Sequence, residues 1–411
     1  MKRALIITYY WPPADGPGVQ RWVKFAKHLP RMGWQPVIFT PQSPEKLVLN
    51  ESLPASLPVS FKLYRKFFRI EPEVNPVTIN GKPWNKLCGR IRENIFIPDS
   101  VISLVGPSET YLKQYLKAHP VDVIITTGPP HSMHLIGRNL HRETGIKWIA
   151  DFRDPWTENF YFKYLRLTDK SERKHRELEQ SVLDEADAII SSSPSVQDDF
   201  RARTATPVHM IPYGFDSDDF PAVECERDKE HFRIVHTGLL AADGNPLFLW
   251  DHLAHRCYKD AEFKSRLQIR LAGRTDQEII DAIVDRGLEG NLVNLGYLSH
   301  SRTVEQQRLA DILILPLRQE PEYLKVLPEK IFEYLASRRP VLGIGPGNSV
   351  AAQLLQECRA GQMFDWDRRD CIKQFVQSEW ERWKAGEGCE NSADISQYEF
   401  RELTRTLTKI L

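Results

Sequence analysis

The chain has few features that would place it in a specialised class of protein. Its 411 residues include six cysteines, and no two of them have the CxxC spacing. Such scattered thiols indicate neither a zinc site nor a disulfide framework, and they favour a reducing cytoplasm. No apolar run approaches the roughly 20 residues that cross a bilayer. The start, MKRALIITYYWPP, has no small-residue cleavage site after its apolar part, so we expect a buried first strand rather than a signal peptide.

The formal net charge is zero, and we expect no nucleic-acid partner. The charge is unevenly spread, because residues 1–100 hold 15 lysines or arginines but 7 aspartates or glutamates. Within this basic quarter, residues 61–70 read FKLYRKFFRI and interleave aromatic with basic side chains. This composition suits an anionic membrane surface or a phosphorylated acceptor. The alternative is a structural segment whose basic side chains extend over apolar surface to water.

Apolar runs of strand length alternate with helical patterns along the whole chain, which is typical of parallel sheets flanked by helices. In the first half the predicted strands are 4–9, 36–40, 121–126, 148–152, 188–191 and 208–211. In the second half they are 233–236, 268–272, 292–295, 312–315, 341–344 and 362–364.

This pattern predicts an α/β fold of two doubly wound, Rossmann-like domains that face one another across a cleft. The acidic segment 217–229 has no clear periodicity and is a reasonable linker. We therefore predict domains at 1–216 and 217–395, followed by a last helix within 396–411. Ligands of such sheets bind beyond the carboxyl ends of the strands, so the loops at these ends matter most.

The most informative stretch is residues 311–341, DILILPLRQEPEYLKVLPEKIFEYLASRRPV. An apolar strand is followed by a loop rich in proline and glutamate, and then by an amphipathic helix that begins near Pro328. Ile331, Phe332 and Leu335 share one side of this helix. The helix is therefore expected to bury that side.

Lys330 and Glu333 lie on the opposite side, in the first turns of the same helix. The positive end of a helix dipole repels a lysine unless an anion such as a phosphate occupies the same place. A carboxylate one turn deeper can accept two hydroxyl hydrogens from a sugar ring. The pair thus suits a phosphate with a hydroxylated group, although a solvated helix face with ordinary charges is the alternative.

In the first half, the loop WPPADGPGVQR after the first strand places Gly16 and Gly18 at the start of a helix. Glycines there let backbone amides approach a diphosphate or a sugar. The loop lacks the third glycine of GxGxxG and the Lys-Ser/Thr of a P-loop. A dinucleotide dehydrogenase and an ordinary P-loop NTPase are therefore disfavoured.

Two further strand ends carry titratable groups. His131 lies in TTGPPHSMHLIG, while Asp151, Arg153 and Asp154 lie together in ADFRDPW. Such groups inside a cleft are candidates for acid–base or charge-stabilising roles. The alternatives are a structural histidine and an ion network that holds the loop.

The strand ends of the second half read HTG, AGR and GYL. Gly238 can face a diphosphate, Arg274 can supply charge to it, and the backbone around Tyr297 can pair with the edge of a nucleobase. Each is equally well explained as a plain strand-to-helix turn.

These motifs, in this order, resemble bacterial glycosyltransferases of family four, which have the GT-B fold. The resemblance covers nearly the whole chain and rests on WPPADGPGVQR, TTGPPHSMHLIG, ADFRDPW, IPYGFD, LAGR, LGYLSH, ADILILPL and PEKIFEYLASRRPVL. It implies a nucleotide-sugar donor held by the C-terminal domain, an acceptor held by the N-terminal domain, and transfer with retention of anomeric configuration. It also implies that the last helix packs back on the first domain.

Residue by residue, the resemblance assigns Glu333 to the ribose hydroxyls of the donor, and Gly16 and Gly18 to the donor phosphates. We choose Lys330 for charge neutralisation. The resemblance implies no metal and no cofactor, because such enzymes stabilise the departing diphosphate with helix N-termini and basic side chains.

The chain departs from the family pattern in three places. Lys325 stands where many members have a second glutamate that contacts the donor sugar, and the loop GLLAADGNP lacks an arginine and lysine found in many members. Arg274 and Lys330 would then carry more of the phosphate charge. ADFRDPW lies near the place where many members have a histidine, so Asp154 is our candidate for positioning the donor sugar and acceptor, with Asp151, Arg153 and His131 as alternates.

The sequence thus predicts a cytoplasmic glycosyltransferase, in possible peripheral contact with the inner face of a membrane, that uses a glycan or lipid-linked acceptor. Three alternatives stay open: a sugar-nucleotide epimerase of the same fold, a non-catalytic nucleotide-sugar-binding subunit, and a two-lobed periplasmic binding protein. The missing signal peptide weakens the last of these.

Overall fold

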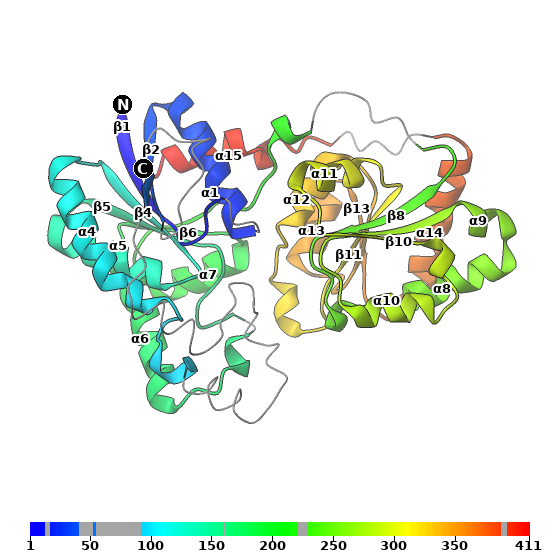
Figure 1. Ribbon diagram of the computed structural model, residues 1–411, viewed down its shortest axis with the longest axis horizontal. Helices are drawn as coiled ribbons and strands as arrows, with labels where there is room; N and C mark the ends of the chain where they lie inside the picture. The colour runs from blue at the N-terminus through cyan, green and yellow to red at the C-terminus, as the bar shows by residue number, and fades with distance from the viewer. Residues whose placement is uncertain (13–16, 41–51, 55–91, 160, 221–227, 388–392) are drawn as a thin grey trace. The chain divides into compact units, whose positions relative to one another are not determined.

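The computed structural model describes residues 1–12, 17–40, 52–54, 92–159, 161–220, 228–387 and 393–411 (Figure 1). The described residues form two compact units. Unit 1 comprises Met1–Pro212 with Phe400–Leu411, and unit 2 comprises Tyr213–Glu399. The sequence prediction had placed the boundary after residue 216 and the start of the returning segment at 396.

Within the described residues, unit 1 is built on a parallel sheet of seven strands in the order β3-β2-β1-β4-β5-β6-β7. The strands are β1 (Lys2–Ile7), β2 (Trp34–Thr40), β3 (Ser52–Pro54), β4 (Val123–Gly128), β5 (Lys147–Phe152), β6 (Ala188–Ser191) and β7 (Val208–Met210). The six runs predicted in the first half correspond to β1, β2 and β4 to β7, and β3 is the strand that the prediction missed.

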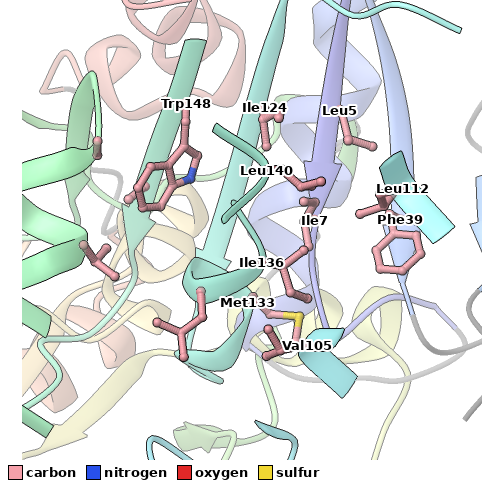
Figure 2. Packing of buried hydrophobic residues seen from close by; sticks show 14 of the residues in the cluster. Leu5, Ile7, Phe39, Val105, Leu112, Ile124, Met133, Ile136, Leu140 and Trp148 are labelled. Atoms are coloured by element: carbon pink, nitrogen blue, oxygen red, sulfur yellow. The ribbon is translucent and has the colours of Figure 1, made fainter. Parts of the chain in front are cut away.

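Both faces of this sheet are buried, which explains why its strands are continuous apolar runs. Leu5 and Ile7 belong to one cluster, packed against helices on that face (Figure 2), and Ala4 and Ile6 belong to a second cluster on the other face. The first face is covered by α4 (Val105–Ala118), α5 (Ser132–Thr144), α6 (Asp169–Glu185) and α7 (Pro194–Arg203). The second face is covered by α1 (Pro17–His28) and α15 (Phe400–Thr408).

The C-terminal helix α15 packs on unit 1. The ring of Phe400 lies 5.3 Å from the ring of Phe25 on α1, and Leu403 and Leu407 are buried in the same cluster. The ammonium of Lys147 donates a hydrogen bond of 2.6 Å to the carbonyl of Ile410. The end of the chain is therefore part of the core formed by its beginning.

Unit 2 contains, within the described residues, a parallel sheet of six strands in the order β10-β9-β8-β11-β12-β13. The strands are β8 (Phe232–Thr237), β9 (Leu267–Ala272), β10 (Leu292–Gly296), β11 (Ile312–Pro316), β12 (Val341–Ile344) and β13 (Gly361–Phe364). All six were predicted from the apolar runs of the second half. The prediction of two doubly wound parallel sheets is thus confirmed.

Helices cover both faces of this sheet as well. They are α8 (Leu247–Lys259), α9 (Ala261–Arg266), α10 (Gln277–Val284), α11 (His300–Arg308), α12 (Lys330–Ser337), α13 (Val350–Glu357) and α14 (Arg369–Lys384). Short 3-10 helices include η5 (Ser217–Asp219), η6 (Ala242–Gly244), η8 (Pro321–Leu324) and η9 (Ser396–Tyr398). Among the helices of the described residues, none has the length and apolar character needed to cross a membrane.

The predicted amphipathic helix is α12. Its residues Ile331, Phe332 and Leu335 are fully buried, as the periodicity predicted. Arg338 ends it in a left-handed conformation with φ of 59°, and Pro340 follows. The polar side of α12 is therefore left at the edge of the unit 2 sheet.

Candidate functional site

The carboxyl edge of the unit 2 sheet gathers residues that the sequence assigned to a donor nucleotide. The strand order reverses between β8 and β11, and sheets of this kind bind ligands beyond the strand ends at such a reversal. Gly238 follows β8 with φ of 89°, a conformation that suits glycine. Lys330 and Glu333 lie in the first turn of α12, which follows β11. The structure thus brings these three predicted residues to one reversal point.

Lys330 is held against the turn after β8. Its Nζ lies 3.1 Å from Nε2 of His236 and donates to the carbonyl of Leu239 at 3.4 Å. A Cβ added to Gly238 would lie 3.4 Å from the same Nζ, so the ammonium is in contact with this turn. Burial lowers the pKa of Lys330 to about 8, although the Glu333 carboxylate opposes that shift. The lysine is therefore charged at neutral pH in surroundings that disfavour its charge.

Glu333 is oriented by two side chains of α11. Its Oε1 lies 2.7 Å from Nε2 of His300, and its Oε2 accepts a hydrogen bond of 2.8 Å from Nε2 of Gln307. The His300 ring also lies 3.9 Å from a carboxylate oxygen of Asp219. Each carboxylate oxygen has more than one lone pair, so Glu333 can still accept hydrogen bonds from a ligand.

A buried polar network joins Glu333 to the turn after β8. Gln307 also contacts Oγ1 of Thr237 at 3.2 Å, and the backbone N–H of Thr237 donates to the hydroxyl of Tyr334 at 3.1 Å. All three side chains are fully or almost fully buried. Hydrogen bonds within a buried network hold its members in one geometry. The positions of Gly238 and Glu333 are thus coupled.

His236, His300 and Gln307 were missed as site residues by the sequence prediction. His236 belongs to HTG and His300 to LGYLSH, and both motifs were noted without assigning a role to the histidine. Gln307 lies in a helix whose polar residues gave no signal of their own. The available signal for the two histidines was that each belongs to a motif at the carboxyl end of a predicted strand.

The turns after β8, β9 and β10 are packed backbone to backbone. The N–H of Gly238 donates to the carbonyl of Ala272, and the N–H of Gly273 donates to the carbonyl of Gly296. A Cβ at Gly273 would lie 2.3 Å from the Gly238 carbonyl oxygen, so this position requires glycine. These turns present Arg274 and Tyr297 at the same sheet edge, where both are exposed.

Lys325, which stands where the resemblance implies a second glutamate, is exposed at the end of η8. Nearby in sequence, Arg318 forms an ion pair of 2.9 Å with Asp243 of η6. Because its side chain is exposed, Lys325 adds a positive charge to the surface of the segment that leads to α12.

In unit 1 the reversal lies between β1 and β4, and Gly18 and Arg153 meet there. A Cβ at Gly18 would lie 1.6 Å from Nη1 of Arg153, so the guanidinium occupies the space that a side chain would need. Arg153 also donates to the carbonyl of Pro129, and its side chain is 5% exposed. The positive charge of Arg153 and the N-terminal end of α1 would together stabilise an anion bound at this place.

Asp151, predicted beside Arg153, has a different environment. It forms a fully buried ion pair of 3.0 Å with Arg21 of α1, and it accepts hydrogen bonds from Nε1 of Trp22 at 2.7 Å and from Thr127 at 2.8 Å. These contacts occupy both carboxylate oxygens. These contacts favour a structural role for Asp151, and its predicted catalytic role stays a prediction.

His131 is buried in an aromatic stack. Its ring is parallel to that of Trp156 at 4.7 Å, and neither ring nitrogen has a hydrogen-bond partner among the described residues. Burial lowers the pKa of His131 well below its ordinary value, so the ring is neutral. The neighbouring His134 contacts Oγ1 of Thr126 at 2.9 Å, and burial lowers its pKa to about 3. These features favour the structural alternative for His131.

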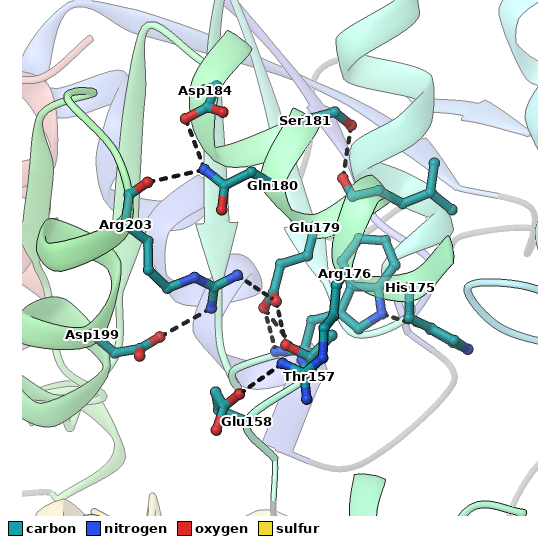
Figure 3. Close-up of polar contacts among 12 residues, drawn as sticks. Thr157, Glu158, His175, Arg176, Glu179, Gln180, Ser181, Asp184, Asp199 and Arg203 are labelled. Carbon is teal, nitrogen blue, oxygen red and sulfur yellow. Dashed lines mark hydrogen bonds and ion pairs between the residues drawn. The ribbon is translucent and has the colours of Figure 1, made fainter. Parts of the chain in front are cut away.

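Asp154 remains as an exposed carboxylate after β5. The positive charge of Arg153 acts on this carboxylate. The loop that carries Asp154 is held by Glu179 of α6, which accepts hydrogen bonds from the backbone and hydroxyl of Thr157 and pairs with Arg203 at 2.8 Å (Figure 3). The buried Glu179 thus fixes the end of the Asp154 loop.

Two predicted features lie outside the described residues. They are Gly16 and the aromatic and basic segment 61–70.

Comparisons with known proteins bear on the fold and on the class of activity. Residues 18–214 match the family model described as a Glycosyl transferase 4-like domain. No curated protein matches the chain. Solved structures similar to the whole chain include sucrose-phosphate synthase from Thermosynechococcus elongatus, with 13% identity, a TM-score of 0.67 and coverage of 100% of this chain and 98% of that chain.

Two other similar structures are enzymes of related architecture. One is a UDP-forming alpha,alpha-trehalose-phosphate synthase from Burkholderia xenovorans in complex with glucose-6-phosphate, with 10% identity, a TM-score of 0.64 and coverage of 99% of both chains. The other is WaaG, a glycosyltransferase involved in lipopolysaccharide biosynthesis, with 11% identity, a TM-score of 0.58 and coverage of 98% of this chain and 95% of that chain.

At these identities the similar structures show the fold, which is the GT-B fold of two Rossmann-like α/β domains. The matched domain in unit 1 points to sugar transfer independently of the fold. Together, the Glycosyl transferase 4-like domain and the GT-B fold support a glycosyltransferase.

Proposed function

We propose that the chain is a retaining glycosyltransferase that moves a sugar from a nucleotide-diphosphate donor to a glycan or lipid-linked acceptor. The observation that carries the proposal is the pair Lys330 and Glu333 at the reversal point of the unit 2 sheet, each held by buried or half-buried partners. The ammonium can neutralise the diphosphate, and the carboxylate can accept hydrogen bonds from the ribose hydroxyls.

Metal-independent transfer is part of the proposal. When the sugar leaves, negative charge grows on the diphosphate, and a fixed positive charge next to it lowers the barrier. Lys330, the N-terminal amides of α12 and the exposed Arg274 can supply that charge. Retention and the absence of a metal are both implied by the family resemblance.

In unit 1 we propose Asp154 as the carboxylate that positions the donor sugar and acceptor, with Arg153 as its cationic neighbour. Asp154 is the exposed member of the group predicted after β5. We also propose a cytoplasmic location, based on the scattered cysteines, and peripheral contact with an anionic membrane, based on the basic composition of residues 1–100. Binding to anionic vesicles that weakens with added salt would support the membrane contact.

A thermal-shift screen with UDP, GDP, ADP, CDP and their sugar conjugates tests the donor site. A ligand at 100 times its dissociation constant should stabilise the protein by about 2.7 kcal/mol. Glu333→Ala should remove most of the shift given by the selected ligand. A wild-type protein that binds none of these ligands would contradict the proposal.

A second candidate function is a non-catalytic nucleotide-sugar-binding subunit, which the exposed Lys325 in place of a glutamate favours. Analysis of products separates the possibilities. A glycosyltransferase consumes the donor in step with glycosylated acceptor, an epimerase converts the donor without acceptor, and a binding subunit leaves the donor unchanged. Slow hydrolysis of the donor by the wild type would also exclude a binding subunit, provided that Asp154→Asn abolishes the hydrolysis and still binds the donor.

A further inference from the structure

His236 lies next to Lys330 and has no assigned role. It is the penultimate residue of β8, it is 1% exposed, and its Nε2 lies 3.1 Å from the ammonium of Lys330. A lysine ammonium can only donate, so Nε2 of His236 must be the acceptor. The imidazole proton is therefore on Nδ1, and Nδ1 has no hydrogen-bond partner among the described residues.

This arrangement destabilises the fold in two ways. A buried N–H without an acceptor is disfavoured, and a native structure that keeps one usually has a functional reason. A half-buried ammonium is also disfavoured, as the lowered pKa of Lys330 shows. Neither feature is needed to pack β8 against α12, because apolar side chains would do so without these penalties.

The ammonium of Lys330 has a donor left for a ligand. It carries three N–H groups, of which one points to His236 and one to the carbonyl of Leu239. Among the described residues the ammonium has no third acceptor. The Gly238 turn lies close to the same nitrogen, because glycine has no Cβ that would stand between the backbone and the ammonium. A ligand oxygen bound at this turn would therefore be within reach of the remaining donor.

We infer that His236 is a positioning residue that holds the Lys330 ammonium over the Gly238 turn, where it meets the diphosphate of the donor. The inference rests on the proposed function. The loop GLLAADGNP after β8 has no lysine or arginine, so Lys330 supplies a charge that this loop lacks and has to be placed accurately. A neutral imidazole suits this task, because a carboxylate in its place would cancel the positive charge and a cation would repel it. Burial and the adjacent Lys330 both keep His236 neutral.

Two substitutions of His236 test the inference. His236→Phe keeps a planar ring without an acceptor, whereas His236→Gln keeps an oxygen near the position of Nε2. The Kd is measured by calorimetry for UDP and for uridine, or for the diphosphate selected in the screen and its nucleoside. His236→Phe should raise the Kd of the diphosphate by about tenfold or more and leave that of the nucleoside unchanged. His236→Gln should stay within about threefold of the wild type for both.

The comparison between the two ligands separates positioning from general damage. An equal loss of diphosphate and nucleoside affinity in His236→Phe would indicate a structural role and overturn the inference, and so would an unchanged diphosphate affinity. A wild type that binds no nucleoside diphosphate would instead contradict the proposed function.

The unsubstituted protein provides a test that does not depend on how the variants fold. Nitrogen NMR of the His236 ring near neutral pH should show a neutral imidazole with its proton on Nδ1. A proton on Nε2 would leave no lone pair for Lys330 and would overturn the inference.

Discussion

Replacing Lys330 by methionine should weaken nucleoside diphosphate binding strongly while the protein stays folded. Methionine keeps an apolar stem of similar shape and removes the ammonium. A hydrogen bond to a charged group contributes about 1.5–3 kcal/mol, which corresponds to a rise in Kd of about 10- to 150-fold. We use this range because Lys330 is half-buried and its partner would be an anion.

Stability should change little in this variant. The pKa of Lys330 is about 8 in the folded protein, below the ordinary value for lysine. The folded state therefore binds this proton less tightly than the unfolded chain does, so the charged lysine reduces stability at neutral pH. Removing the charge offsets the cost of leaving Nε2 of His236 without its donor, so the free energy of unfolding should change little, which separates a loss of binding from a loss of fold.

The same pKa predicts how binding depends on pH. A diphosphate favours the charged lysine, so its affinity should decrease above about pH 8, as Lys330 of the free protein loses its proton. His236 on β8, Glu333 on α12 and His300 on α11 are the titratable neighbours at this site. Because the methionine variant keeps all three, it should lose the decrease above pH 8 if Lys330 causes it.

The assay is calorimetric titration of wild type, Lys330→Met and Lys325→Met with the selected nucleoside diphosphate across this pH range. Lys325→Met is the matched control, because it removes an exposed lysine of the neighbouring segment. Equal affinities for the wild type and the Lys330 variant, or equal losses in both variants, would refute a specific role of Lys330.

Two further predictions concern unit 1. Arg21→Ala leaves the carboxylate of Asp151 buried without its cation, so urea unfolding should show a loss of about 3–5 kcal/mol, and a loss below about 1 kcal/mol would contradict the structural role of the pair. Gly18→Ala should displace Arg153 and lower transferase activity by about 100-fold with the fold retained. The control Gly106→Ala, whose Cβ would meet no atom within 4 Å, should leave activity unchanged, and equal activity in the two variants would contradict a role of Arg153.

Much of the fold could be predicted because parallel strands buried on both faces are continuous apolar runs. β1 illustrates this, since Ala4 and Ile6 enter one cluster while Leu5 and Ile7 enter the other. β3 has three residues and is too short to give such a run. Periodicity also placed Lys330 and Glu333 on the polar side of α12, because positions on one helix are set by local geometry.

The partners of these residues could not be predicted, because they come from other elements. His236 is 94 residues from Lys330 along the chain, and spacing does not report contacts of this kind. Asp151 shows the opposite case, since it is close to Arg153 in sequence but lies within β5 with its carboxylate against α1. Arg153 follows the strand and lies against Gly18. Neighbours in sequence were therefore separated by the sheet, and distant residues were brought together.

The central claim is that unit 2 binds the nucleotide of a sugar donor through Glu333. The most direct measurement is the Kd of the selected nucleoside diphosphate for the wild type, for Glu333→Ala and for the control Glu305→Ala, which changes an exposed glutamate of α11. Loss of the hydrogen bonds to the ribose should raise the Kd of Glu333→Ala by about 10- to 150-fold, and the control should match the wild type. Wild-type affinity in Glu333→Ala would contradict the claim.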